Sequence, residues 1–275
     1  MNFELSEEHK MICDAAREFA QELKAGAIER DEAAKFPTDF VKQMGELGFM
    51  GIMTPEAYGG AGMDTLAYVL VLEEIAKIDA SAAVIVSAHN SLVLYGLNAY
   101  GTEEQKQKYL IPLAKGEKLG AFALSEPEAG SDASSQHTTA EDKGDHYLLN
   151  GTKNWITNGG HADIYLVIAQ THPEKGHKGI NVLIVEKGLP GFTIGPKENK
   201  LGIRSSDTHS LLFSDVQVPK ENRIGEDGFG FKFAMKTLDG GRIGIAAQAL
   251  GIAAGAYDLA LAYSKERKTF GKPIS

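Results

Sequence analysis

The sequence holds a single cysteine, Cys13, among its 275 residues. One cysteine excludes an internal disulfide framework and a zinc site built from cysteines, and it suits a reducing compartment. The eight histidines show neither the H-E-x-x-H pattern nor paired spacing with carboxylates. We therefore expect no catalytic metal.

Positive charge is also in short supply, with 28 basic against 37 acidic side chains and a net charge of -9. Nucleic-acid binding loses its usual electrostatic source, so we expect no nucleic-acid partner. The first ten residues, MNFELSEEHK, are acidic and polar, unlike a secretory signal or a transit peptide. This start favours a cytoplasmic protein of bacterial type, or one that is already processed.

Two common enzyme motifs are missing. Gly60-Ala-Gly62 and Gly228-Phe-Gly230 lack the third glycine of G-x-G-x-x-G and its strand-to-helix setting, so we expect no Rossmann nicotinamide site. The G-x-S-x-G motif of many hydrolases is absent as well. Hydrophobic residues make up 43% of the chain, which is enough for a folded protein with a large core.

Residues 1–118 predict a helical bundle. The helical stretches are residues 5–23, 38–48, 64–77 and 80–97, followed by a capping box at Thr102-Glu-Glu-Gln105. The fourth stretch is nearly all apolar, but Ser87, His89, Asn90 and Ser91 lie in its middle, where a bilayer would penalise them. We expect it to be a buried core helix rather than a membrane span, with His89 a core or pocket histidine.

Residues 119–231 predict a β domain, either a sandwich or a barrel. Asn150-Gly151 lies between two β-prone runs and predicts a hairpin, because both turn positions tolerate positive φ. Further strand-like runs, separated by glycine, proline and aspartate, are residues 164–168, 180–185, 192–194, 210–213 and 216–218.

Helical spacing returns after Gly230, and residues 232–275 predict the beginning of a C-terminal helical domain. Each glycine in this helix costs about 1 kcal/mol relative to alanine, so we expect another element or a ligand to approach the backbone closely. These glycines are Gly240, Gly241, Gly244, Gly251 and Gly255. The predicted fold class is α+β and multidomain: an all-α bundle, a β domain and a second bundle that looks incomplete.

The segment ALSEPEAGSDAS, residues 123–134, follows a small apolar strand. Together with Trp155-Ile-Thr157 it offers apolar faces, hydroxyl groups and backbone donors, a mixture that suits a flat heteroaromatic ring such as a flavin. From the residues alone, a strand and a loop beside a core tryptophan remains an open alternative. We interpret Glu126, Glu128 and Asp132 as loop-ordering or solvated groups, because carboxylates in turns bond neighbouring N–H groups.

Five motifs, in the right order over the whole chain, resemble the acyl-CoA dehydrogenase family. Residues 123–134 resemble its first signature, and Trp155-Ile-Thr-Asn-Gly159 is similar to its second flavin-contacting segment. The other three motifs are Tyr58-Gly-Gly-Ala-Gly62, Leu238-Asp-Gly-Gly-Arg242 and Arg267-Lys-Thr-Phe-Gly-Lys-Pro273. The Leu-Asp-Gly-Gly-Arg form is most similar to the short-chain, butyryl-CoA dehydrogenase-like branch.

The resemblance implies an FAD site, with Trp155 packed against the isoalloxazine and Thr157 hydrogen-bonded at its N5 edge. It also implies that Arg267 and Phe270 reach the FAD of a neighbouring subunit, so we expect a homo-oligomer, a dimer or a tetramer. The implied cofactor-binding residues are Phe122, Leu124, Ser125, Gly130, Ser131, Trp155, Ile156, Thr157, Arg267 and Phe270.

The resemblance further implies a short-chain acyl-CoA substrate. Arg242 would meet the nucleotide end of CoA and Asp239 the pantetheine amides; their spacing of one helical turn also fits an ordinary intrahelical ion pair. The implied substrate-binding residues are Ser131, Asp239, Gly240, Gly241 and Arg242.

The implied reaction is α,β-dehydrogenation, as in fatty acid β-oxidation, with electrons passed to electron-transferring flavoprotein. The general base would be a glutamate expected beyond Ser275; Gly241 occupies the alternative position, so the catalytic residue is unknown and we expect weak flavin retention. Two alternatives remain: an acyl-CoA oxidase or flavin monooxygenase on the same scaffold, and a non-catalytic acyl-CoA-binding fragment.

Overall fold

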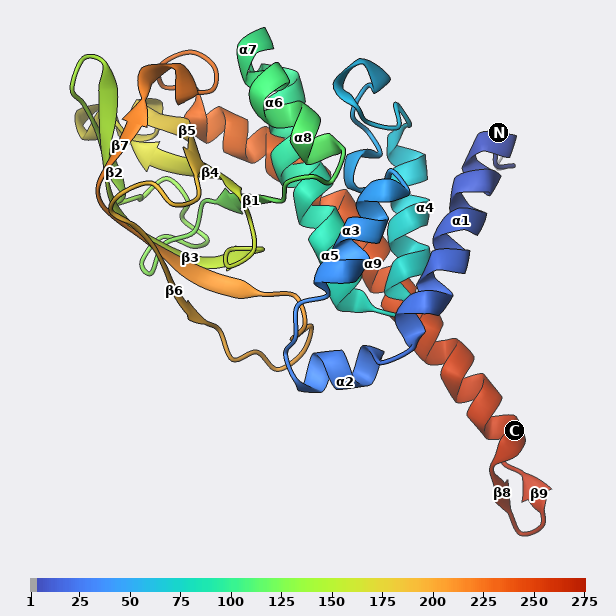
Figure 1. Ribbon diagram of the computed structural model, residues 1–275. Helices are drawn as coiled ribbons and strands as arrows, with labels where there is room; N and C mark the ends of the chain where they lie inside the picture. The colour runs from blue at the N-terminus through green and yellow to red at the C-terminus, as the bar shows by residue number, and fades with distance from the viewer. Residues whose placement is uncertain (1–3) are drawn as a thin grey trace.

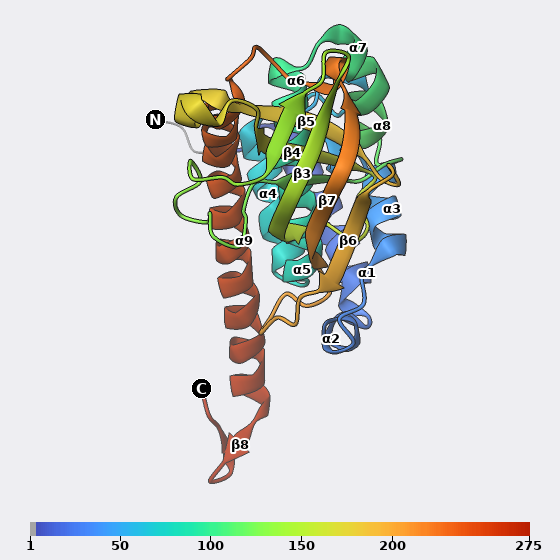
Figure 2. The same ribbon diagram turned by 90° about the vertical axis from the view of Figure 1, so that its left-hand side faces the viewer.

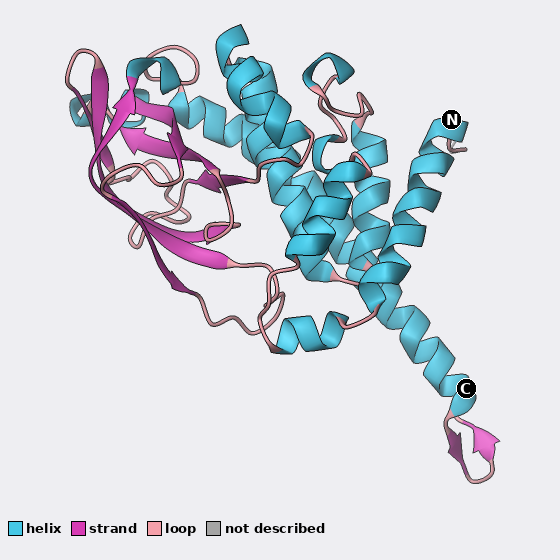
Figure 3. Ribbon diagram, in the orientation of Figure 1, coloured by secondary structure: helices cyan, strands magenta, loops and turns pink. Residues whose placement is uncertain are grey.

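The computed structural model describes residues 4–275 (Figure 1). Helices from the first part of the chain lie on one side and a curled sheet on the other, as the colouring in Figure 3 shows. The long helix α9 (Gly230–Glu266) contacts both, since it packs on α4 and α5 as well as on β4 and β5. The architecture is the predicted α+β fold.

Three helices of the helical part, α1, α4 and α7, have side-chain caps at or near the predicted positions. The side chain of Ser6 accepts a hydrogen bond from the backbone of His9, and Asp64 caps α4 through the backbone of Ala67. The predicted capping box at Thr102 and Gln105 is present. The helices are α1 (Glu7–Lys24), α2 (Ala27–Glu32), α3 (Thr38–Glu46), η1 (Phe49–Gly51), η2 (Glu56–Tyr58), α4 (Thr65–Ala76), α5 (Ala80–Ala88), η3 (His89–Leu94), α6 (Tyr95–Tyr100), α7 (Glu103–Gln105), η4 (Lys106–Leu110) and α8 (Ile111–Ala114).

Helices α5, η3 and α6 form one continuous helix, Ala80–Tyr100, which is long and apolar enough to cross a membrane. In its most apolar 18-residue stretch, however, 78% of the residues are buried inside the protein. This is the predicted core helix. His89 is fully buried within it; its Nε2 lies 2.9 Å from the Leu113 carbonyl, and its Nδ1 accepts from the Gly120 backbone at 3.1 Å. Burial lowers the pKa of His89 to about 4, so the ring is neutral and joins this helix to α8 and the first strand.

Seven strands form one connected sheet. The central strand β4 pairs antiparallel with β5 and parallel with β1, and β2 connects it to the long antiparallel pair β3 and β7. Apolar cores cover both faces of β4, which explains its continuous apolar sequence. The strands are β1 (Gly120–Ala123), β2 (Thr139–Asp142), β3 (His146–Thr157), β4 (Ile164–Gln170), β5 (Ile180–Glu186), β6 (Phe192–Lys197) and β7 (Thr208–Pro219), with short helices η5 (Pro173–Gly179) and η6 (Lys220–Asn222).

The hairpin predicted at Asn150-Gly151 is wrong, because β3 runs straight through both residues. Opposite them β7 carries an extra residue, Asp215, at φ 53°, and the Asn150 side chain bonds the backbone and carboxylate of Asp215 at 2.8 and 3.0 Å. Gly151 has φ 142°, and a Cβ there would lie 2.6 Å from the Thr138 hydroxyl. Asn-Gly here serves a β-bulge rather than a turn, and the two runs predicted at 210–213 and 216–218 are one strand.

Helix α9 approaches its neighbours through its glycines, as predicted for four of the five. A Cβ on Gly251 would lie 2.4 Å from the Glu73 carbonyl oxygen, and one on Gly255 would lie 2.1 Å from that of Lys77. Gly241 and Gly244 are similarly crowded, whereas nothing lies within 4 Å of a Cβ on Gly240. The glycine face is therefore a packing surface against α4 and α5, and Gly240 is the exception.

The rest of α9 is largely exposed, and Figure 2 shows the helix extending past the other elements to the strands β8 (Lys268–Thr269) and β9 (Lys272–Pro273). This helix is also long and apolar enough to cross a membrane. In its most apolar 18-residue stretch, 22% of the residues are buried. Its exposed large apolar residues are Ile243, Ile245, Leu250, Ile252, Tyr257, Leu259, Leu261 and Tyr263.

The two kinds of glycine give opposite predictions for stability. Gly251→Ala pushes a methyl group into a backbone carbonyl and is expected to lower the free energy of unfolding by about 1–3 kcal/mol. Gly240→Ala, on the same helix but facing open space, is expected to raise it by up to about 1 kcal/mol through helix propensity. Urea unfolding followed by circular dichroism measures both, and equal effects of the two variants would contradict the close packing.

Candidate functional site

The end of β1 and the end of β3 lie side by side. The Asn154 backbone donates to the Ser125 carbonyl at 2.8 Å, which joins residues 124–137, after β1, to the predicted Trp155-Ile-Thr157 segment. Ser125 and Thr157 are half-buried and retain exposed surface. The two segments that the sequence selected for a flavin ring are therefore neighbours in space.

Trp155 is held out of the core by a β-bulge. Between Lys153 and Ile156, strand β3 carries an extra residue relative to β7, and Trp155 has φ 58° with 57% of its surface exposed. A bulky residue at positive φ costs about 1–3 kcal/mol and persists only where its surroundings fix it. The alternative of a core tryptophan is wrong, and the large exposed ring at a strained position points to a binding role.

The other predicted cofactor residues on this side differ in what they can offer. Ile156 is 2% exposed with its side chain in the sheet core, so it presents only backbone to a ligand. Leu124 is 8% exposed and packs with Phe122 against the core between sheet and helices. Gly130 and Ser131 are exposed on the loop.

A buried ion pair fixes this loop to β3. Lys153 is fully buried, and its Nζ lies 2.7 Å from Glu126 Oε1, 2.9 Å from the Leu124 carbonyl and 3.1 Å from Gln136 Oε1. Glu126 in turn accepts from the backbones of His137 and Thr138 at 2.6 and 3.1 Å. The pair thus ties both ends of the 124–138 segment to the strand that carries Trp155.

The electrostatics of the pair follow from its burial. Burial lowers the pKa of Lys153 to about 8, although the Glu126 charge acts in the opposite direction. Burial alone would raise the pKa of the Glu126 carboxyl, but the Lys153 charge and hydrogen bond outweigh this and hold that pKa below its usual value. At neutral pH both groups are charged and compensate each other.

The loop carboxylates order the loop, as predicted. Asp132 accepts from the Ser134 and Ser135 hydroxyls at 2.6 and 2.5 Å, which closes a tight turn directly after Ser131. Glu128 is exposed, and its carboxylate lies 3.9 Å from the His137 ring.

No group of three or more metal-ligating side chains lies together among residues 4–275.

Four of the five predicted acyl-CoA residues lie on α9, and the fifth, Ser131, lies on the loop after β1. Asp239 and Arg242 form an ion pair with each other, and both side chains are about 70% exposed, at 71% and 70%. Gly241 is buried, with its missing Cβ 2.8 Å from Leu92 in η3. The spacing of one turn therefore gives the intrahelical pair, on a helix face that leaves both groups accessible.

Arg267 and Phe270 are not brought to the site. They lie beyond the end of α9, on the hairpin that projects away from the sheet in Figure 2, and Phe270 is 100% exposed at φ 54°. Within its own chain, strand β9 of this hairpin lies against α9. The hairpin itself projects away from the sheet (Figure 2).

Comparison with known families accounts for this arrangement. Residues 6–117 match the N-terminal domain of acyl-CoA dehydrogenases, residues 121–216 the middle domain and residues 228–275 the C-terminal domain. The chain belongs to the acyl-CoA dehydrogenase family. This family membership is the one that the five motifs predicted.

Individual acyl-CoA dehydrogenases are very similar to the chain. The short-chain specific acyl-CoA dehydrogenase of Clostridium acetobutylicum is 55% identical over all 275 residues, which span 73% of that protein. The butyryl-CoA dehydrogenase structure from Megasphaera elsdenii aligns with a TM-score of 0.97 at 49% identity, again over 100% of this chain and 73% of the other. A chain in a structure described for the electron transferring flavoprotein of Acidaminococcus fermentans aligns at 0.98 and 52% identity over the same shares.

Lys153 is a residue beside this candidate site that sequence reasoning missed. In β3 the alternate positions Tyr147, Leu149, Gly151 and Lys153 share a face, and the first two are buried core residues. A lysine on a core face predicts a buried carboxylate partner, because an unpaired buried ammonium is strongly penalised. Glu126 in the preceding loop was the available partner.

The ion pair gives a prediction in which stability depends on pH. Lys153→Met leaves Glu126 buried without a counter-charge, so the variant is expected to lose about 3–5 kcal/mol at pH 7. Burial is then opposed only by the hydrogen bonds from His137 and Thr138 and is expected to raise the folded-state pKa of Glu126 above its ordinary value of 4.5. The carboxyl would gain a proton on folding, so the deficit shrinks as pH falls. Thermal and urea unfolding between pH 4.5 and 7 measure this.

Two controls bracket the effect. Lys143→Met removes a surface partner of Glu141 and is expected to cost less than about 1 kcal/mol. Adding Glu126→Gln to Lys153→Met removes the stranded charge and should recover much of the loss, as in other buried pairs. A deficit of Lys153→Met that does not vary with pH would contradict the assignment.

Proposed function

We propose that the chain supplies the flavin and acyl-CoA contacts of an FAD-dependent dehydrogenase that acts on short-chain acyl-CoA thioesters. The observation that carries the proposal is the exposed ring of Trp155, fixed at positive φ beside Ser125 and Thr157. Similarity to a short-chain specific acyl-CoA dehydrogenase and to butyryl-CoA dehydrogenase supports the acyl length.

The residues present fit FAD. The Trp155 indole offers an apolar face, and Ser125 and Thr157 offer half-buried hydroxyls and backbone groups next to it, as the edge of an isoalloxazine requires. Gly130 has no neighbour within 4 Å of a Cβ, so the backbone before Ser131 is open to approach by a ligand. When bound, FAD accepts the hydride that leaves the β-carbon of the thioester.

Arg242 and Asp239 are proposed to bind the CoA part of the substrate. In the free chain their opposite charges pair, and both remain accessible at the surface of α9. The Arg242 guanidinium suits a phosphate, and Asp239 can accept from an amide N–H. By the resemblance, some family members carry the general base at the position of Gly241, which has no side chain in this chain. The proton acceptor is therefore not assigned to any of residues 4–275.

Arg267 and Phe270 are proposed to contact FAD in a neighbouring subunit of a homo-oligomer, either a dimer or a tetramer. The projection of their hairpin away from the sheet (Figure 2) and the full exposure of Phe270 support a role outside their own chain. Electron-transferring flavoprotein is the proposed electron acceptor, in line with the structure described for that protein in Acidaminococcus fermentans. The single cysteine is in keeping with the proposed cytoplasmic location.

The proposal is tested by loading the chain with excess FAD and titrating it anaerobically with butyryl-CoA. We expect the flavin band near 450 nm to be perturbed, and its bleaching would report hydride transfer. A shift without bleaching would favour the binding-only alternative, which the missing side chain at Gly241 supports. An unchanged spectrum would contradict a short-chain acyl-CoA ligand. Rapid reoxidation by air of a bleached sample would favour an oxidase or monooxygenase.

Arg242→Ala is expected to raise the butyryl-CoA concentration at half-saturation by about tenfold, equivalent to about 1.4 kcal/mol, because a charge-assisted phosphate contact is lost. FAD binding should be unchanged, since Arg242 is proposed to touch only the substrate. Lys232→Ala, another exposed cation on α9, is the control and should leave both unchanged. Equal weakening by the two variants would indicate a general effect of charge.

A further inference from the structure

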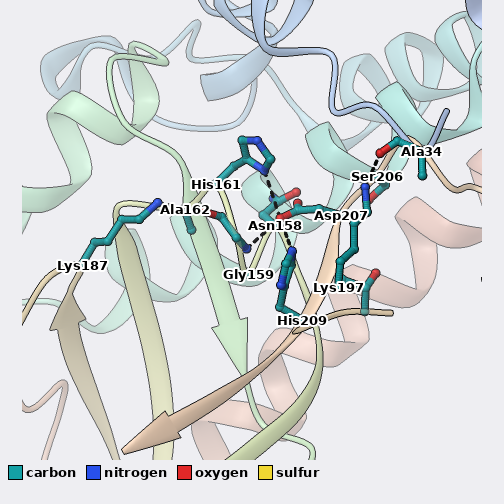
Figure 4. Close-up of polar contacts among 12 residues, drawn as sticks. Ala34, Asn158, Gly159, His161, Ala162, Lys187, Lys197, Ser206, Asp207 and His209 are labelled. Carbon is teal, nitrogen blue, oxygen red and sulfur yellow. Dashed lines mark hydrogen bonds and ion pairs between the residues drawn. The ribbon is translucent and has the colours of Figure 1, made fainter. Parts of the chain in front are cut away.

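The turn that follows the Trp155 segment is built around a buried carboxylate, Asp207 (Figure 4). Asp207 lies just before β7 and its side chain is 0% exposed. Its Oδ2 accepts from the Gly160 backbone at 2.7 Å, and its carbonyl accepts from the Asn158 backbone at 3.1 Å. One residue thus holds both arms of the turn that leaves β3.

Two imidazoles converge on the same oxygen. His161 Nδ1 lies 3.1 Å from Asp207 Oδ2, and His209 Nε2 lies 3.5 Å from it, reaching it from opposite sides in Figure 4. The His161 ring also stacks on Phe36 of the helical part, with ring centroids 3.9 Å apart. The carboxylate therefore ties the turn to β7 and, through His161, to the helical layer.

The turn leaves no room for a side chain at Gly159 or Gly160. A Cβ on Gly160 would lie 2.6 Å from Asp207 Oδ2, and one on Gly159 would lie 2.8 Å from the Ile156 carbonyl. The Tyr165 hydroxyl donates to the Gly159 carbonyl at 2.9 Å on the other side. The turn is therefore closely packed, with the buried Asp207 carboxylate against it.

The contacts that Asp207 makes with the turn lie directly after the Trp155 bulge. Thr157 pairs with Thr208 and Ile156 with His209, so the residues next to Asp207 set the end of the β3 and β7 ladder. Lys153 and Glu126 fix the other side of the bulge. A residue held at positive φ needs constraint from both sides, and Asp207 supplies the second.

We propose that Asp207 is a positioning residue that sets the orientation of Trp155 and Thr157. Its role toward a flavin ring rests on the proposed function, whereas its role toward Trp155 does not. The Oδ1 atom of Asp207 is buried without a hydrogen-bond partner, so this carboxylate carries an energetic penalty. A buried group with such a penalty is easier to explain by the geometry that it fixes than by a gain in stability.

The test uses the only tryptophan of the chain as a reporter. Asp207→Ala is expected to change the emission maximum and the acrylamide quenching of Trp155 in the unliganded chain, and to weaken FAD binding by about tenfold. Asp207→Asn keeps an oxygen acceptor for Gly160 and should restore the wild-type tryptophan signal. Asp215→Ala is the matched control, because Asp215 also links β7 to β3 but does so at Asn150, on the far side of Lys153.

The proposal is overturned if Asp207→Ala leaves the Trp155 signal unchanged, or if Asp215→Ala alters it equally. Should Asp207→Ala fail to fold, Gly160→Ala breaks the same contact from the other partner and must change the Trp155 signal for the proposal to stand. A changed Trp155 signal in a chain whose wild type binds no FAD would support the positioning role and refute the proposed cofactor.

Discussion

The site depends on one constraint: a large aromatic side chain held at positive φ on a β-bulge. Such a conformation is unfavourable by itself, and one buried polar contact on each side of the bulge stabilises it. Lys153 and Glu126 fix the strand before Trp155 and fasten the 124–138 segment to it. Asp207 fixes the turn after it. The exposed indole, the neighbouring hydroxyls and the loop that carries Ser131 take their positions from this pair of buried contacts.

The predicted cofactor-binding residues fall into two groups that one chain does not bring together. The first group surrounds Trp155 at the sheet edge and presents groups suited to a flat ring. The second, Arg267 and Phe270, lies on a hairpin beyond α9 with no contact to the sheet. A cation and an aromatic ring projected into solvent have little structural use in their own chain. This division is in line with the proposal that FAD is bound between copies of the chain.

The sequence predicted most of the helical layer because its information there is local. Periodicity, the N-caps at Ser6 and Asp64 and the capping box at Thr102 each act within one turn of helix. The sheet was harder, because its bulges depend on the opposite strand: Asn150-Gly151 forms a hairpin only if the chain reverses, and Asp215 on β7 lets it continue. Trp155 and Thr157 were found by motif, whereas Lys153 and Asp207 were missed because their roles lie in distant partners.

Helix α9 has a mechanical consequence for how a ligand could enter. It is one uninterrupted helix of 37 residues that contacts both the helical layer and the sheet, and the sequence places no proline in it. A hinge motion that separates the helical layer from the sheet would have to break this helix or separate its glycine face from α4. The helix therefore restrains hinge motion between the two layers, so a ligand of the proposed site would enter without the layers separating.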